Sequence, residues 1–358
     1  MTSNSSAAIA NGLVTMPSLR PHEVFWRDHH DWLRDKGYEL RPRYKPERLP
    51  VPLPRLARAI SRRGAAEDPN TDEDSIEATR LSEGRTVELR KVSRLDAHDI
   101  TVQQYLATWP LASHPKNHTV PILDVLELPD EGERALILVT PSLEPFHAPA
   151  VRTVGEAIDF LEQVLEGLQF MHNCNIAHRN CAELHVLQDP APVYPRTRRR
   201  QRGTSEGSGG TLRPVRYYLA DGARAQQYGH GSRFRRAASQ ASVRTAAAAV
   251  GFDDPFAADV RALGVAIERV FLSDVRGMAF LSPLVEEMMR VDPATRPHID
   301  DVIVKFREVK GRLHWWTLRA RLMRKDERGL SRLRRDFVHV LRTFGYIIIR
   351  RPAIPSFA

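Results

Sequence analysis

Two short segments hold the polar side chains that are the candidates for catalysis or metal binding. The first reads AHRNCAELH at 177–185, and the second ends a strand-like run with ADGA at 220–223. The amide of Asn180 can hold a hydroxyl group through a hydrogen bond, but it cannot accept a proton at neutral pH. The imidazole of His185 is a poor ligand for magnesium, which prefers hard oxygen atoms. Asp221 offers such oxygens, although Asp before Gly is also common in ordinary turns.

The elements that position these segments follow from the spacing of apolar residues. Residues 154–173 place an apolar side chain every three or four positions, which predicts a helix directly before the first segment. Apolar runs predict strands at 86–92, 120–128 and 134–140, and a helix at 97–108 interrupts them. Further helices are predicted at 257–272, 281–291 and 298–314. A small antiparallel sheet followed by a helical region is an α+β arrangement.

The remaining segments are distinguished by composition. Residues 1–20 are rich in Ser, Ala and Asn, which predicts disorder. Residues 21–60 carry aromatic side chains among charges, so we expect this segment to dock through a short amphipathic helix. A basic, Gly-rich and Ser-rich insertion occupies 196–214, and a basic amphipathic extension occupies 317–358.

The order and spacing of these segments resemble those of protein kinases. Residues 177–189 are similar to the catalytic loop, and 216–224 are similar to the metal-binding loop. Residues 254–264 resemble the helix whose buried Asp anchors the catalytic loop, and 288–303 resemble a later DP…RP signature. Other stretches are similar to the kinase-like proteins abundant in mushroom-forming fungi: 19–44, 109–126, 153–172 and 193–197.

The resemblance implies a two-lobed protein-kinase-like fold. A small antiparallel β lobe at 76–143 would precede a larger helical lobe at 144–316. In the catalytic loop, Asn180 stands where a kinase has its catalytic Asp, beside His178 and Arg179. His185 stands where an Asn binds the second magnesium ion.

The segment that resembles the metal-binding loop also departs from the family's pattern. Asp221 keeps the position of a magnesium ligand, but Gly222 and Ala223 replace the Phe and Gly that usually follow it. Two structural positions are retained. Asp259 corresponds to the anchor of the catalytic loop, and Arg296 corresponds to the partner of a Glu that closes the activation segment.

The nucleotide site departs from the family's pattern as well. Arg90 stands at the position of the ATP-binding Lys, and Glu88 shares its face of the strand, where a small residue normally covers the adenine. Asp99 aligns with the Glu that pairs with that Lys. Thr140 and Leu143 fall in a hinge whose backbone could bind an adenine, but the strand pair before Arg90 has no Gly-rich phosphate loop.

The resemblance implies ATP and magnesium as cofactors, whereas these substitutions argue against their use. The sequence therefore predicts a pseudokinase, an intracellular binding or scaffolding module with little or no phosphotransfer and with a protein partner. One alternative is a weakly active atypical protein serine/threonine kinase that uses Asp221 and Arg90. A second alternative is a membrane-peripheral adaptor that uses the basic tail.

The charge and the cysteine content of the chain indicate the kind of partner and the cellular compartment to expect. The chain has 53 Lys and Arg against 44 Asp and Glu, for a formal net charge of +9. Residues 317–358 hold eleven of the basic residues and three of the acidic ones, so an acidic partner is expected there. Two cysteines are too few for a disulfide framework that holds the fold together, which suits a reducing compartment. No secretory signal or long apolar run is present, so we expect a cytoplasmic or nuclear protein.

The tail itself has two interpretations. Residues 333–352 alternate apolar side chains with Arg in a basic amphipathic pattern, which suits an anionic membrane surface. We favour a helix that docks on the helical lobe and leaves a basic face in solvent. No motif in the chain is specific for nucleic acid.

Overall fold

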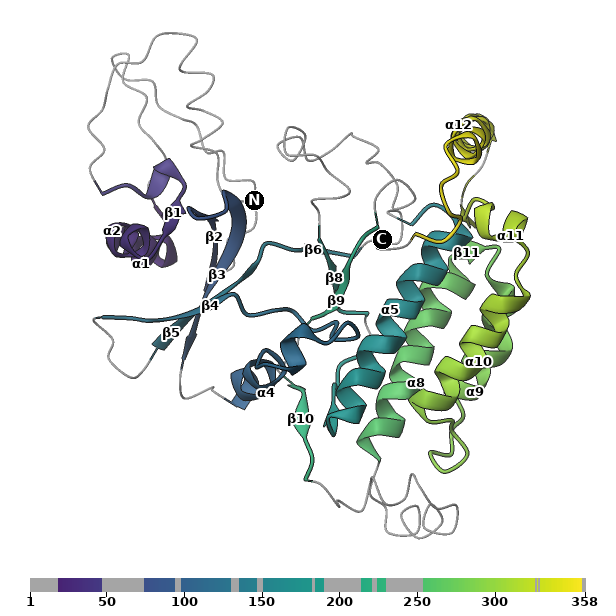
Figure 1. Ribbon diagram of the computed structural model, residues 1–358, viewed down its shortest axis with the longest axis horizontal. Coiled ribbons are helices and arrows are strands. Elements are labelled where there is room, and N and C mark those ends of the chain that lie inside the picture. Colours follow the sequence, from purple (N-terminus) through teal and green to yellow (C-terminus); the bar gives the residue numbers. More distant parts are fainter. Residues whose placement is uncertain are drawn as a thin grey trace, which may run out of the picture. The chain divides into compact units, whose positions relative to one another are not determined.

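The computed structural model describes eleven stretches of the chain: residues 19–46, 74–93, 98–129, 135–146, 151–181, 184–189, 214–220, 224–229, 254–325, 327 and 329–355 (Figure 1). The secondary structure is mixed, with many helices and a curled antiparallel sheet, as expected for an α+β protein. Contacts divide the chain into two compact units. Unit 1 comprises Met1–Asp96 and Ile122–Ser142, and unit 2 comprises Ala97–Pro121 and Leu143–Ala358. The disorder predicted for 1–20 and the insertion at 196–214 fall almost wholly outside the described residues.

Unit 1 contains a five-stranded antiparallel sheet in the order β1-β2-β3-β5-β4. Its elements are α1 (Pro21–Asp28), α2 (His30–Asp35), β1 (Tyr38–Leu40), a 3-10 turn (Pro42–Tyr44), β2 (Ser75–Arg80), β3 (Arg85–Ser93), β4 (Asp124–Glu127) and β5 (Ala135–Pro141). The strands predicted at 86–92 and 134–140 therefore form, and the one at 120–128 forms over a shorter range.

Alternation along β3 separates the two faces of this sheet. Val87 and Leu89 are buried, whereas Glu88 is half-buried and Arg90 is exposed. The buried face shares a core with Trp26 of α1 and Leu33 of α2, both fully buried. The amphipathic helix expected within 21–60 is thus a pair of short helices that pack on the sheet.

A hydrogen bond joins the two edge strands of the sheet. The hydroxyl of Tyr38 on β1 donates to Oδ2 of Asp124 on β4 at 2.9 Å. Burial, together with this carboxylate, raises the pKa of Tyr38 to about 12. Because β1 and β4 are the first and last strands in the sheet order, the sheet must curl strongly for them to meet.

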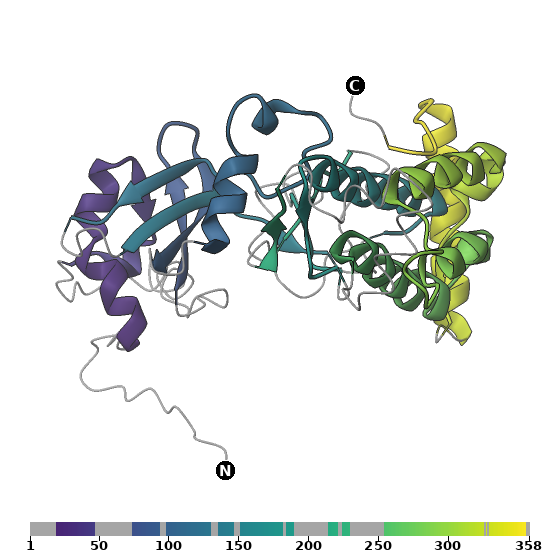
Figure 2. The ribbon, with the colours of Figure 1, turned by 90° about the horizontal axis from the view of Figure 1, so that it is seen from below.

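Unit 2 is mainly helical (Figures 1 and 2). Its helices are α4 (His98–Leu106), α5 (Val154–Asn173), α8 (Pro255–Ile267), α9 (Ser282–Met288), α10 (Ile299–Arg312), α11 (Trp315–Arg319) and α12 (Gly329–Ile348), with a π-helical turn (Glu268–Ser273) and 3-10 turns (Leu111–Ser113 and Ala279–Leu281). Its strands are β6 (Glu144–Pro145), β7 (Ile176–Ala177), β8 (Val186–Gln188), β9 (Tyr217–Leu219), β10 (Gln226–Gln227), β11 (Val275–Arg276) and β12 (Met323–Arg324). The helices predicted at 154–173, 257–272, 281–291 and 298–314 all form.

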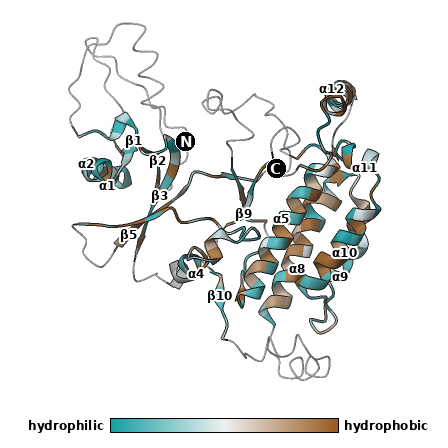
Figure 3. Cartoon of the chain, viewed as in Figure 1, coloured by the Kyte–Doolittle hydropathy of each residue, from teal (hydrophilic) through white to brown (hydrophobic). Residues whose placement is uncertain are grey.

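Helix α5 is the centre of this unit. Thr153 caps its first turn, because its side-chain oxygen accepts the backbone N–H of Glu156 at 3.1 Å. Most of the helix is buried, and α10 packs along it while α9 packs along α8. Figure 3 shows the hydrophobic residues along α5 and α8 that supply this core. None of the described helices is long and apolar enough to cross a membrane.

Residues 97–121 group with unit 2, which differs from the expected lobe boundary at 76–143. Leu106 at the end of α4 is buried in the core around α5. His118 packs against Gly167 of α5, and its Nδ1 lies 3.0 Å from the carbonyl oxygen of Tyr217. Burial lowers the pKa of His118 to about 4, so the ring is neutral at physiological pH. These contacts tie the segment to the helical unit.

Candidate functional site

The turn after β7 is fixed by a buried carboxylate. Asp259 on α8 is 1% exposed, and its Oδ2 accepts the backbone N–H of His178 at 2.7 Å. Its Oδ1 accepts the backbone N–H of Arg179, also at 2.7 Å. The Nε2 atom of His172 on α5 lies 3.1 Å from Oδ2. Hydrogen bonds to a buried carboxylate are short and strong, so this turn is held firmly.

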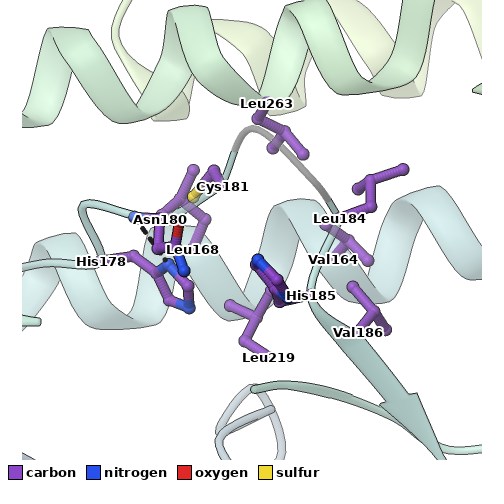
Figure 4. A pocket seen from close by; sticks show the side chains of 10 residues that line it. All are labelled: Val164, Leu168, His178, Asn180, Cys181, Leu184, His185, Val186, Leu219 and Leu263. Carbon is purple, nitrogen blue, oxygen red and sulfur yellow. Dashed lines mark hydrogen bonds between the residues drawn. The ribbon is translucent and has the colours of Figure 1, made fainter. Parts of the chain in front are cut away.

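The side chain of His178 links the turn to the end of β9. The backbone N–H of Asn180 donates to Nδ1 of His178 at 3.3 Å (Figure 4). The proton of the neutral ring therefore resides on Nε2, which donates to the carbonyl oxygen of Ala220 at 3.0 Å. His178 thus holds the residue directly before Asp221. Residues 221–223 lie outside the described part of the chain.

Arg179 adopts an unusual backbone conformation at this turn. Its φ of 63° lies in the left-handed region, which costs a residue other than glycine about 1 kcal/mol or more. The hydrogen bonds that Asp259 accepts from the backbone of this turn offset that strain. The guanidinium donates from Nη1 to Oε1 of Gln226 at 2.7 Å, and Gln226 lies on β10, which pairs with β7. Arg179 therefore connects the turn to α8 through its backbone and to β10 through its side chain.

Asn180 and His185 line the same small cavity (Figure 4). The other lining side chains are mostly apolar and include Val164 and Leu168 of α5 and Leu263 of α8. The cavity volume is about 10 Å³, which leaves room for a single water molecule. The structure thus brings together three of the predicted site residues, His178, Asn180 and His185, among mostly apolar side chains.

The thiol of Cys181 belongs to the same apolar environment. Burial, followed by the nearby carboxylate of Asp259, raises its pKa well above the ordinary value. A protonated, buried thiol is a poor nucleophile and a poor metal ligand. Within the described ranges, no cluster of three or more His, Cys, Asp or Glu side chains could hold a metal ion.

In unit 1, the face of β3 that carries Arg90 also carries opposed carboxylates. The strand register places Glu77 of β2 directly beside Glu88 of β3, and Glu88 beside the buried Thr140 of β5. Glu77 accepts from Nη2 of Arg41 at 2.6 Å and from the hydroxyl of Ser142 at 3.0 Å. The register thus sets two carboxylates side by side on this face, and Glu77 is paired with the guanidinium of Arg41.

Arg90 occupies a neighbouring position on that face. It lies beside Ser75 on one strand and Leu138 on the other, and its side chain is exposed. Arg90 therefore stays available to solvent.

Two predicted site residues are placed only by their elements. Asp99 lies near the start of α4, although its side chain is outside the described set. Leu143 is half-buried and follows β5 in the chain. Neither position reveals a contact with a possible ligand.

Arg296 is a buried structural residue. Its Nη1 donates to the carbonyl oxygen of Ala257 at 2.6 Å, and Nε and Nη2 donate to the carbonyl of Arg290 at 3.0 and 2.8 Å. These bonds connect the first turn of α8 with the loop that follows α9. The guanidinium thus satisfies backbone acceptors that would otherwise be buried without donors.

Sequence reasoning missed Glu77 and His172. Glu77 could have been found by pairing the run at 75–80 with that at 85–93 as a hairpin across the turn at 81–84, since this register sets it against Glu88. His172 carries no local signal, because its contact with Asp259 joins residues 87 positions apart. A search against models of known protein families found no match, and a search of curated proteins found none either.

Proposed function

We propose that this chain has a two-lobed, protein-kinase-like fold whose phosphotransfer chemistry has been lost, and that it acts as a binding or scaffolding module. The observation that carries the proposal is the turn at 178–180. A buried Asp259 fixes its backbone, and the residue presented there, Asn180, is an amide. The resemblance would give that position to the carboxylate that orients the attacking hydroxyl.

The environment of Asn180 supports the loss of chemistry. Phosphoryl transfer depends on positioning the nucleotide and neutralising its charge, mainly through magnesium. Asn180 and His185 share an apolar cavity of about 10 Å³, and neither side chain offers the carboxylate oxygens that magnesium prefers. A loop that is held in place without these groups is suited to recognition rather than to catalysis.

The acidic row on the sheet is independent support. Glu77 and Glu88 lie directly opposite each other on the face that carries Arg90. A phosphate bound near Arg90 would lie close to these carboxylates, and repulsion between like charges opposes binding, although the ion pair of Glu77 with Arg41 reduces that repulsion. Two separate parts of the structure thus argue against the same reaction.

A weakly active kinase is the second candidate, and one contact favours it. His178 holds the carbonyl of Ala220 at 3.0 Å, which fixes the approach to Asp221. A positioned Asp221 could still bind one metal ion, with Arg90 contacting a phosphate. If the chain is a weakly active kinase, its nucleotide binding must depend on both Asp221 and Arg90.

Thermal unfolding of the full chain with ATP and either Mg²⁺ or Mn²⁺ tests the proposal. A ligand that binds only the folded state raises the midpoint, so our proposal predicts a shift of less than about 1 °C at millimolar nucleotide. Asp221→Ala and Arg90→Ala should then give the same result as the natural chain. A clear stabilisation that both substitutions abolish would favour the weakly active kinase instead.

A further inference from the structure

Helix α12 contacts the rest of unit 2 through its polar side. Asp336, His339, Thr343 and Tyr346 recur at helical spacing and are all half-buried. Nε of Arg321 donates to Oδ1 of Asp336 at 2.8 Å, and Nε2 of His339 lies 3.0 Å from the carbonyl oxygen of Arg319. Hydrogen bonds and an ion pair therefore dock the helix on this side.

The opposite side of α12 is apolar and faces solvent. Its large hydrophobic residues follow one stripe, spaced by three, four and seven positions: Leu333, Phe337, Val340, Leu341, Phe344 and Ile348. Phe337, Phe344 and Ile348 are 64%, 62% and 79% exposed. Figure 3 shows this hydrophobic colouring on α12. We had expected a docked helix with a basic solvated face, and the solvated face is instead largely apolar.

An ion cluster at the start of α12 fixes which side of the helix contacts unit 2 and which side, with the apolar stripe, faces solvent. Arg321 pairs with Glu327 at 2.7 Å as well as with Asp336, and Arg335 pairs with Glu327 at 2.9 Å. The hydrogen bond from Arg321 holds the pKa of Glu327 below its usual range, so the cluster stays charged at neutral pH. At the other end of the helix, the guanidinium of Arg319 donates to the carbonyl of Arg351 at 2.5 Å.

The charge around the stripe is almost entirely positive. Asp336 is the one acidic residue in the sequence from 329 to 355, and it is already paired with Arg321. Six arginines lie in the same segment: Arg332, Arg334, Arg335, Arg342, Arg350 and Arg351. Two of them are ion-paired, Arg332 with Asp336 and Arg335 with Glu327. A second copy of the chain would bring two such basic helices together. An occupant with an apolar interior and an anionic surface satisfies both features at once.

We propose that α12 binds an anionic lipid surface, lying flat with its apolar stripe among the acyl chains and its arginines at the headgroups. A helix of 20 residues covers about 30 Å of such a surface. Apolar burial and attraction to anionic lipid act together in interfacial helices. This inference is independent of whether the chain binds nucleotide.

Co-sedimentation of the full chain with vesicles tests the proposal. We expect binding to phosphatidylcholine vesicles that contain about one third phosphatidylserine, and weak binding to phosphatidylcholine alone. The double variant Phe337→Gln and Phe344→Gln keeps the charge and should reduce the bound fraction about tenfold or more. The matched control is Val291→Gln with Val304→Gln, which removes two exposed apolar residues outside α12 and should bind normally.

Unchanged far-ultraviolet circular dichroism and thermal midpoints will show that both double variants fold. Equal binding by the natural chain and the Phe337→Gln, Phe344→Gln variant would overturn the proposal, as would failure of the natural chain to bind either vesicle. A concentration-dependent dimer that the phenylalanine variant abolishes would assign the stripe to a second copy, and would overturn the lipid assignment.

Discussion

The carboxylate of Asp259 accepts the backbone N–H of His178 at 2.7 Å, which joins helix α8 to the turn after β7 across 81 positions of sequence. The same carboxylate accepts the N–H of Arg179. One buried side chain therefore determines the conformation of the segment that presents Asn180. Under the proposed function, Asp259 still holds this turn in place, although the catalytic group that the turn would present in an active kinase is absent.

Replacing Asp259 by Ala should destabilise the fold by roughly 2 to 5 kcal/mol, because the buried N–H groups of the turn lose their acceptors. The matched control is Asp254→Ala on the same helix. Asp254 caps α8 by accepting the N–H of Phe256 at 2.9 Å, and loss of a cap costs about 1 kcal/mol. Urea unfolding would measure both. A cost for Asp259→Ala no greater than that for Asp254→Ala would contradict the brace.

Stability should depend on pH through Asp159 of α5. Burial raises its pKa from the ordinary 3.8 to about 7. Between these values the folded chain keeps a proton that the unfolded chain has released, so this contribution is full below about pH 4 and is lost as the pH rises to 7.

Asp159→Asn removes this titration while keeping an oxygen that can accept from Nε2 of Gln163. We expect the variant to gain stability relative to the natural chain as the pH rises from 4 to 7, by roughly 1 to 3 kcal/mol in total. Urea unfolding at a series of pH values measures the difference. A difference that stays constant across this range would show that Asp159 does not titrate in this way.

Two glycine substitutions test how residues 109–121 join unit 2. A Cβ at Gly167 would lie 2.8 Å from Cβ of His118, so Gly167→Ala should destabilise the fold by about 1 to 3 kcal/mol. Gly311 in α10 has open space at the same position, so Gly311→Ala should be neutral or stabilising by up to about 1 kcal/mol. Thermal unfolding of both variants measures the contrast. Equal changes in the thermal midpoint of the two variants would show that His118 does not pack against Gly167.

Restoring a carboxylate at position 180 should not restore activity. In Asn180→Asp the orienting group returns, but His185 still lines the apolar cavity and Glu77 still opposes Glu88. Positioning and charge neutralisation contribute more to this reaction than the base does. We expect no phosphate transfer to a generic protein substrate. Measurable turnover in this single variant would show that the rest of the machinery is intact.

The sequence predicted those features that depend on local spacing. The apolar period of 154–173 gave α5 with the observed limits, and alternation at 86–92 gave β3. The opposition of Glu77 and Glu88 depends on strand register, which alternation within a single strand does not determine.

The orientation of α12 could not be predicted from the sequence, for a different reason. Its amphipathic pattern revealed two faces, but not which face meets the protein, because that choice depends on partners such as Arg321 and the carbonyl of Arg319. Likewise, the apolar residues of α4 predicted a helix without indicating that Leu106 joins the core of unit 2. Long-range contacts decide both cases.

We propose that the chain does not transfer phosphate, and incubation with radiolabelled ATP and Mg²⁺ or Mn²⁺ measures this transfer. Label incorporated into the chain itself and into a generic protein substrate would be compared for the natural sequence and for Asp221→Ala. We predict that both incorporate no more label than a heat-denatured sample. Incorporation by the natural chain that Asp221→Ala abolishes would contradict the account.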